Sequence, residues 1–371
     1  MPSISYVREI QTPLAINESG QPFFDLTIDT DPKGVTCISD PLAINGETLI
    51  GQSRKDRPVP KMDTSSTPIK NCPFCERNEE RSEESGHVPL DPAYSVANPY
   101  PFGPRIHEVI YTGAAKHDLY DLYADDICAF YGELHRIAVE GREKHGEELD
   151  GLSYGMNCGH YLACGASQPH LHSQVAGLLK KSFNAGDQIA CMYHAWREKY
   201  SGRNFLDDYS TALRSPIPLD AGSQEEGGEG SLIIAENEHA ILYVPIAQHY
   251  RLEMQVMLKA PCVSNILKTT PEIRRGIAEL EATALTAYRL QGINSLNTLL
   301  YAGRFSQADD VDQRIIVSIC PRTSVFAWAE MLGRFVIDEF PWQCAEKFRA
   351  SLDAWAARSE RTIECIRLPN Q

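Results

Sequence analysis

Two histidines and a glutamine in the stretch SQPHLHSQV (167–175) have a spacing that suits chemistry. His170, His172 and Gln174 are two residues apart, and residues i, i+2 and i+4 of a strand point to the same face. We consider three interpretations: polar residues at a sheet edge, two ligands of one metal ion, or one ligand beside one catalytic residue. In the third, a neutral imidazole acts as a nucleophile toward phosphorus once its other nitrogen donates to a backbone carbonyl.

A second candidate lies in NCPFCE, where Cys72 and Cys75 form a C-x-x-C pair. Zinc commonly takes two cysteines at this spacing from a tight turn, plus two ligands from elsewhere. The alternative is a pair of buried thiols without a metal. A thioredoxin-type redox site is disfavoured, because no βαβ pattern surrounds the pair. The histidines that could complete a zinc site are His170, His117 and His107.

The stretch QSRKDRPVP contains Arg54 and Arg57. Arginine binds phosphate through two parallel hydrogen bonds, so a pair can form an anion site. The alternative for an isolated pair in an acidic chain is a solvated loop.

Composition limits the classes of partner. The 371 residues carry a formal net charge of −15, which argues against non-specific binding to nucleic acid or to membrane surfaces. The polar start resembles no signal segment, and no run of about 18 apolar residues predicts a membrane helix. We therefore expect a cytoplasmic protein, in which a close cysteine pair more often binds metal than forms a disulfide.

The elements that must position these residues follow from periodicity and turn signals. An amphipathic helix is predicted from Asp125 to about Lys144, and two strands are predicted to join near Gly159. A helix over 270–292 has Thr270 as its cap, and 81–90 is predicted to be an exposed loop. Strands are predicted at 107–112, 152–159, 161–179, 240–246 and 314–320, a half-buried strand at 251–259, and a C-terminal helix at 345–366.

These patterns predict an α+β fold with mainly antiparallel sheets. The composition shift at DAGSQEEGGEGS predicts an acidic linker or loop over 220–231. It separates a first domain, 1–219, from a second, 232–371. No internal repeat is evident from the sequence.

In combination, the motifs resemble the galactose-1-phosphate uridylyltransferase family, a branch of the histidine-triad superfamily. QPHLHSQ is similar to the family's His-x-His-x-Gln motif, CPFC to its zinc pair, and RKDRP to its nucleotide-binding stretch. NPYPF (98–102) and the strand pair within 236–259 also resemble family segments, and their chain order agrees over roughly 40–345. The resemblance implies two histidine-triad-like halves, each a mainly antiparallel sheet with flanking helices.

The resemblance also implies roles for individual residues. His172 would be the nucleophile that takes up a nucleoside monophosphate, and Ser167 and Gln174 would hold phosphate oxygens. One zinc ion per chain would be bound by Cys72, Cys75, His170 and His117, with His107 as the alternative fourth ligand. The nucleotide pocket would be lined by Arg54, Arg57, Asn98 and Asn157.

The sequence departs from the family in two places. The strand RIIVSIC lacks the histidines of a second metal site found in some members, so we expect no second metal. The positions that would contact a sugar phosphate are occupied by Ser324, Ala329 and Val336, which are poorly suited to sugar hydroxyls.

We therefore predict a nucleotidyltransferase that moves a nucleoside monophosphate from a nucleotide-sugar to a sugar 1-phosphate or phosphate through a covalent His172 intermediate. The alternatives are a dinucleoside polyphosphate or nucleotide-sugar phosphorylase or hydrolase of the same superfamily, and a non-catalytic, zinc-stabilised nucleotide-binding protein. The resemblance further implies a homodimer.

Overall fold

The computed structural model describes the following residues, and all structural statements below concern them: 14–24, 35–39, 47–51, 72–84, 91–99, 101, 103–159, 164–166, 168–180, 185–217, 230–259, 263–307, 310, 312–323 and 328–359. The strands are β1 (Leu14–Ile16), β2 (Pro22–Phe24), β3 (Val35–Ser39), β4 (Glu47–Gly51), β5 (Ala93–Ala97), β6 (His107–Thr112), β7 (Leu149–Cys158), β8 (His172–Leu179), β9 (Ile233–Glu236), β10 (Ala240–Tyr243), β11 (Met254–Leu258), β12 (Leu296–Tyr301), β13 (Ile316–Pro321) and β14 (Arg334–Ile337). The helices are α1 (Pro73–Glu84), α2 (Ala124–His145), α4 (Ala185–Lys199), α5 (Phe205–Arg214), α6 (Pro271–Leu290), α7 (Trp328–Met331) and α8 (Pro341–Ser359).

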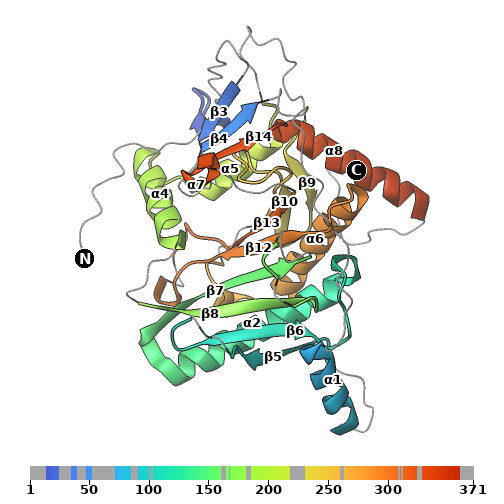
Figure 1. Ribbon diagram of the computed structural model, residues 1–371. Coiled ribbons are helices and arrows are strands. Elements are labelled where there is room, and N and C mark those ends of the chain that lie inside the picture. Colours follow the sequence, from blue (N-terminus) through green and yellow to red (C-terminus); the bar gives the residue numbers. More distant parts are fainter. Residues whose placement is uncertain are drawn as a thin grey trace.

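A long antiparallel sheet organises the fold. Its strand order is β5-β6-β8-β7-β12-β13-β11-β10-β9, so strands from both parts of the chain belong to one sheet (Figure 1). The two parts meet where β7 pairs with β12. Two smaller sheets, β1-β2 and β14-β4-β3, lie outside it. The predicted α+β class with mainly antiparallel sheets is confirmed.

The sheet contains the same arrangement twice. In the first part, two strands, a helix and two more strands give the order β5-β6-β8-β7 around α2. In the second part, β10, β11, α6, β12 and β13 give the order β10-β11-β13-β12. The two halves implied by the family resemblance are thus present as a repeat of topology, which explains why no repeat of residues is evident in the sequence.

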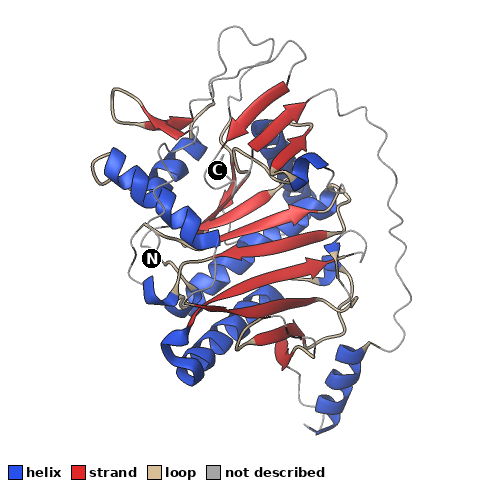
Figure 2. Ribbon diagram, turned by 60° about the vertical axis from the view of Figure 1, so that its left-hand side comes forward, coloured by secondary structure: helices blue, strands red, loops and turns tan. Residues whose placement is uncertain are grey.

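Helices α2 and α6 pack against each other and cover one face of the sheet (Figure 2). The buried side of α2 carries the periodic apolar residues from which the helix was predicted, including Leu134, Ile137 and Ala138. Helix α6 begins as expected, because the Thr270 side chain accepts a hydrogen bond from the backbone nitrogen of Ile273. A cap of this kind stabilises a helix by about 1 kcal/mol.

The opposite face differs between the two parts. Over the second part it is covered by α4 and α5, where Tyr209 of α5 packs against Tyr243 of β10 with ring centroids 6.0 Å apart. We expected 251–259 to be half-buried, which is wrong: every residue of β11 is buried. The polar residues of this strand are accommodated by hydrogen bonds, since Gln255 bonds to Tyr243 and to Glu253.

Other predictions have mixed outcomes. The predicted exposed loop at 81–90 is wrong at its start, because α1 continues to Glu84, and 85–90 lie outside the described residues. The predicted strand 161–179 is wrong at its start, because β8 begins only at His172, and 160–163 lie outside the described residues. Gly159 directly follows β7: φ there is 105°, and a Cβ would lie 2.3 Å from the carbonyl oxygen of Asn294, so only glycine fits. Among the described helices, none combines the length and hydropathy that crossing a membrane requires.

The division into domains at 220–231 stays a prediction, because 218–229 lie outside the described residues. Helices α4 and α5 precede this segment yet bond to residues that follow it. Arg314 pairs with Asp207 at 2.5 Å, and Arg197 pairs with Asp312 at 2.6 Å. The two parts of the chain are therefore interlocked by α4 and α5 as well as by the sheet.

Candidate active site

The histidine motif lies where the chain enters β8. We expected both histidines inside one strand, which is wrong, because β8 begins at His172 and His170 precedes it in a bend. The backbone nitrogen of Leu171 donates to Lys116 instead of continuing the strand pairing. His170 is thus turned toward the loop that follows β6, while His172 stays on the sheet face together with Gln174.

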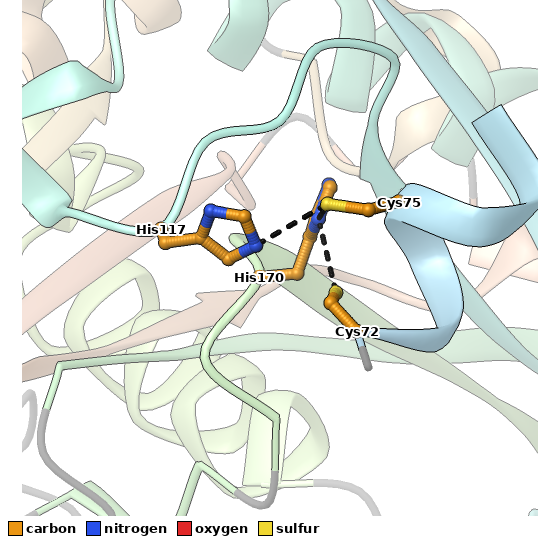
Figure 3. A group of neighbouring side chains, drawn as sticks. All are labelled: Cys72, Cys75, His117 and His170. Carbon is orange, nitrogen blue, oxygen red and sulfur yellow. Dashed lines mark hydrogen bonds between the residues drawn. The ribbon is translucent and has the colours of Figure 1, made fainter. Parts of the chain in front are cut away.

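The C-x-x-C pair lies at the start of α1, with Cys72 immediately before the helix and Cys75 in its first turn. Nδ1 of His170 is 3.6 Å from each of the two sulfur atoms, and Nε2 of His117 is 3.4 Å from Sγ of Cys75. All four ligand atoms lie within 4.8 Å of one another (Figure 3). The structure thus brings together the four residues predicted to bind zinc, from α1, from the loop after β6 and from the bend before β8.

The separations in this cluster fit a tetrahedral zinc ion. Zn–S and Zn–N bonds of about 2.3 and 2.0–2.1 Å place sulfur and nitrogen ligands about 3.5 Å apart across a tetrahedron. The three S···N distances quoted above match that value. Two sulfur and two nitrogen donors are also a set that zinc prefers.

The orientation of His170 supports the same interpretation. Its Nε2 lies 2.9 Å from both the carbonyl oxygen and Oγ1 of Thr112, and the carbonyl can only accept, so Nε2 carries the proton. Nδ1 then presents a lone pair to Cys72 and Cys75. A bond from the distant nitrogen of a ligating imidazole to a carbonyl is a common support of metal sites.

Burial sets the charges of the cluster. Burial lowers the pKa of His170 to about 4 and also lowers the pKa of His117, so both rings are neutral. Burial and the neighbouring Cys72 raise the pKa of Cys75 to about 12. A thiolate in this position therefore requires a nearby cation, which a bound zinc ion would provide.

The ring of His172 is held in one orientation. Its Nδ1 lies 2.7 Å from the carbonyl oxygen of His170, which can only accept, so Nδ1 is the protonated nitrogen. The ring packs near Phe74 of α1, with centroids 5.7 Å apart. Burial lowers its pKa, so the ring is neutral. Within the described part of the chain, its Nε2 has no hydrogen-bond partner and keeps its lone pair for a ligand.

An asparagine pair continues the polar row across the sheet. Ser173 pairs with Met156, which places His172 beside Asn157 on the neighbouring strand. Asn297 of β12 donates to Oδ1 of Asn157 at 2.6 Å and to the carbonyl oxygen of Cys164 at 2.8 Å. Because its oxygen is engaged, Asn157 is left with its NH₂ group as the donor for a ligand.

His107 is not part of the cysteine cluster. Its Nε2 lies 3.1 Å from Oε1 of Gln174 and 3.1 Å from Nδ2 of Asn98. Of the two candidates for a fourth ligand, the geometry favours His117. Gln174 and Asn98, predicted for separate roles, therefore lie in contact, joined by His107.

Three predicted site residues, Ser167, Arg54 and Arg57, lie outside the described residues. Two site residues, Thr112 and Asn297, were missed by sequence reasoning. The contact between His107 and Gln174 was missed as well. The sequence contains no local signal for the first two, since each acts through a strand pairing. His107 was noticed only as a possible ligand.

Solved structures of other proteins share the fold of this chain. No family model matches the chain, and no curated protein matches it in sequence. An ADP-glucose phosphorylase from Arabidopsis thaliana, solved with bound ADP-glucose, has a TM-score of 0.64 at 16% identity, covering 85% of this chain and 98% of that one. A GalT-like protein from the same plant has a TM-score of 0.62 at 15% identity, with the same coverage of both chains. A uridylyltransferase structure has a TM-score of 0.60 at 18% identity, covering 79% of this chain and 95% of that one.

This chain has the uridylyltransferase fold. The resemblance drawn from the motifs is thereby confirmed at the level of the fold. The match extends over nearly the whole of each solved chain, so the uridylyltransferase fold here includes both parts of the long sheet. Within that fold, the chemistry has to be argued from the side chains of this protein.

Proposed function

We propose that the protein is a nucleotidyltransferase that carries a nucleoside monophosphate on His172 between two phosphate-bearing substrates. One observation supports this most directly: Nδ1 of His172 donates to a carbonyl, which leaves Nε2 as a neutral nucleophile on the same sheet face as Gln174. A neutral imidazole held in this way is competent to attack phosphorus. The donor would be a nucleotide-sugar or a dinucleotide.

In the first step, the lone pair of Nε2 attacks the α-phosphorus. The new N–P bond forms as the bond from that phosphorus to the bridging oxygen breaks, and the departing phosphate keeps the electron pair. The imidazole of the intermediate is cationic, and the carbonyl oxygen of His170 stabilises the proton on Nδ1. In the second step, an oxygen of the acceptor phosphate attacks the phosphorus, and Nε2 regains its lone pair.

The protein contributes positioning and donors more than proton transfer, as is usual for phosphoryl chemistry. Asn157 and Gln174 flank His172 on the neighbouring strand and on its own strand. Both are neutral amides, and their NH₂ groups can donate to the non-bridging oxygens. Arg54, Arg57, Ser167 and Asn98 remain the proposed further contacts with the nucleotide.

We also propose that Cys72, Cys75, His117 and His170 hold one zinc ion per chain. When bound, the ion would supply a structural link between α1, the loop after β6 and the bend that leads into β8. His170 would then be fixed both as a ligand and as the carbonyl partner of His172. Two further parts of the proposal, a homodimer and a cytoplasmic location, rest on resemblance and composition, and sedimentation would test the first.

The test is intact-protein mass spectrometry after incubation with UDP-, ADP- and GDP-sugars, without an acceptor. The expected result is an added nucleoside monophosphate on His172 from one of them, removed when phosphate or a sugar 1-phosphate is added. The variant His172→Asn is the control and should acquire no mass. Absence of an adduct with every donor, in protein that contains zinc, would refute the covalent route.

Two alternatives make different predictions in the same experiment. A hydrolase would release the nucleoside monophosphate to water, so an adduct that is stable without an acceptor excludes it. A non-catalytic nucleotide-binding protein would show no turnover with any acceptor, and His172→Asn would bind nucleotide as well as the wild type does.

A further inference from the structure

The side-chain amide of Gln174 contacts two residues from neighbouring elements. Its Oε1 lies 3.1 Å from Nε2 of His107 in β6 and 3.5 Å from Nδ2 of Asn98, which directly follows β5. His107 is buried, and its carbonyl oxygen accepts from the backbone nitrogen of Asn98 at 2.8 Å. The three side chains form a fixed group beside the nucleophile's strand.

The other end of the amide is left for a ligand. Within the part of the chain that the structure describes, the amide nitrogen of Gln174 donates to no protein atom. The strand pairing places Gly155 opposite Gln174, so no side chain covers it from β7. Gln174 also lies two residues from His172, on the same face of β8. Its NH₂ group is therefore available to a phosphoryl group bound at His172.

The proton on His107 decides which end of Gln174 faces the ligand. An amide oxygen only accepts, so the short contact with Nε2 of His107 requires a proton on that nitrogen. Without it, two acceptors would face each other, and the amide would turn to donate its NH₂ to His107. The ligand would then meet an oxygen, which repels phosphate. With that proton present, the Asn98 amide must turn its oxygen toward Nε2 of His107, which its nearly symmetric shape allows, so His107 and not Asn98 is then the donor to Gln174.

We propose that His107 is a positioning residue: it donates to Oε1 of Gln174 and so fixes the NH₂ group of Gln174 as a donor to the phosphoryl group. The inference rests on the proposed function, because it takes the ligand at His172 to be a phosphoryl group. It assigns His107 a role distinct from metal binding. Because His107 also contacts Asn98, the test must isolate its coupling to Gln174.

A double-mutant cycle on His107 and Gln174 tests this coupling. His107→Leu removes the donor and keeps the bulk, Gln174→Ala removes the amide, and the fourth protein carries both changes. With Gln174 present, His107→Leu should slow formation of the His172 adduct about 10- to 100-fold, less than the roughly 100- to 1,000-fold for loss of a whole donor, because the Gln174 amide itself remains. In the Gln174→Ala background, the same change should alter the rate by less than about 3-fold, because its effect has already been lost.

Two further variants separate positioning from support of the fold. His107→Gln can still donate through its amide and should restore most of the rate. His145→Leu, at the end of α2, is a matched histidine-to-leucine control and should leave the rate unchanged. Equal slowing by His107→Leu in both backgrounds, or no slowing in either, would overturn the proposal.

For the same four proteins, calorimetry measures the affinity for AMP, UMP and GMP, which requires no covalent step. Coupled binding losses, about 5-fold per single variant, would support the positioning role even if no adduct forms. In that outcome the covalent function fails and the role of His107 stands. Equal binding by all four proteins, or no binding by the wild type, would overturn the role of His107.

Discussion

The ring of His172 donates from Nδ1 to the carbonyl oxygen of His170 at 2.7 Å. Nδ1 of that same His170 lies 3.6 Å from the sulfur atoms of Cys72 and Cys75. His170 therefore joins His172 to the cysteine cluster, through its backbone on one side and its ring on the other. Any change that moves His170 should therefore alter both the geometry of the cysteine cluster and the orientation of the His172 ring.

Loss of a cysteine ligand should therefore affect zinc and chemistry together. We expect Cys72→Ser to lower the zinc content from about one per chain to a small fraction of that, because serine is a poor zinc ligand. Adduct formation at His172 should fall as well, since His170 is no longer fixed. Elemental analysis and mass spectrometry measure the two effects. Cys191→Ser, at an exposed cysteine outside the cluster, should change neither, and a fully active, zinc-free Cys72→Ser protein would contradict this prediction.

Thr112 should tune the affinity for zinc without providing a ligand. Its Oγ1 donates to the carbonyl oxygen of Ala114 and accepts from Nε2 of His170, both at 2.9 Å. Thr112→Val removes this acceptor but leaves the backbone carbonyl, so we expect about a 10-fold weaker affinity, at the low end for such supporting contacts. Competition with a chelator measures it. Thr211→Val in α5 is the matched control, and equal affinities in both variants would argue against a supporting role for Thr112.

Arg304 should be far more important for stability than an exposed arginine. Its buried guanidinium bonds to Asp187 and to the carbonyl oxygen of Leu179, and it lies 4.0 Å from Asp150. Arg304→Met removes the direct partner of the part-exposed Asp187 and the cation nearest the buried Asp150, which should cost at most about 3–5 kcal/mol. Arg105→Met, in an exposed pair with Glu148, should cost at most about 1 kcal/mol. Urea unfolding measures both, and similar losses would contradict the distinction.

Glu281 should make stability fall as the pH rises. It is fully buried in α6, Tyr131 of α2 donates to it, and burial raises its pKa from 4.5 to about 7. Below pH 4.5 the carboxyl is protonated in both the folded and the unfolded chain. Between pH 4.5 and 7 the unfolded chain releases the proton while the folded chain retains it, so stability decreases across this window, by up to about 3 kcal/mol in total.

Glu281→Gln removes this titration. We expect the free energy of unfolding of the variant to fall less than that of the wild type between pH 4.5 and 7, with the two curves diverging toward pH 7. Urea unfolding over a pH series provides the comparison. Parallel curves would show that Glu281 is ionised in the folded protein.

The sequence was most informative where structure depends on local periodicity. Helix α2 begins and ends within one residue of the predicted positions, because its apolar side repeats at three- and four-residue steps. Strand β11 shows where that information stops. Alternation in 251–259 predicted a solvated face, yet every residue of β11 is buried. Its Gln255 bonds to Tyr243, against which Tyr209 of α5 packs, and α5 comes from a distant part of the chain.

The same limit applies to the site. Cys72, Cys75, His117 and His170 could be grouped because the motifs resemble a known family, and the structure brings them together. The partnership of His107 with Gln174 could not be foreseen, because it depends on a diagonal contact between β6 and β8.

The repeated four-strand unit gives the molecule two comparable sheet faces, and the same kind of diagonal contact occurs in a different environment on each. On the first, the diagonal between neighbouring strands joins His107 to Gln174, whose side chain is only partly buried. On the second, Glu253, which directly precedes β11, accepts from Ser318 of β13 at 2.5 Å, and both residues are buried. The first unit thus carries the residues proposed to react, whereas the second unit supplies buried core to the same sheet.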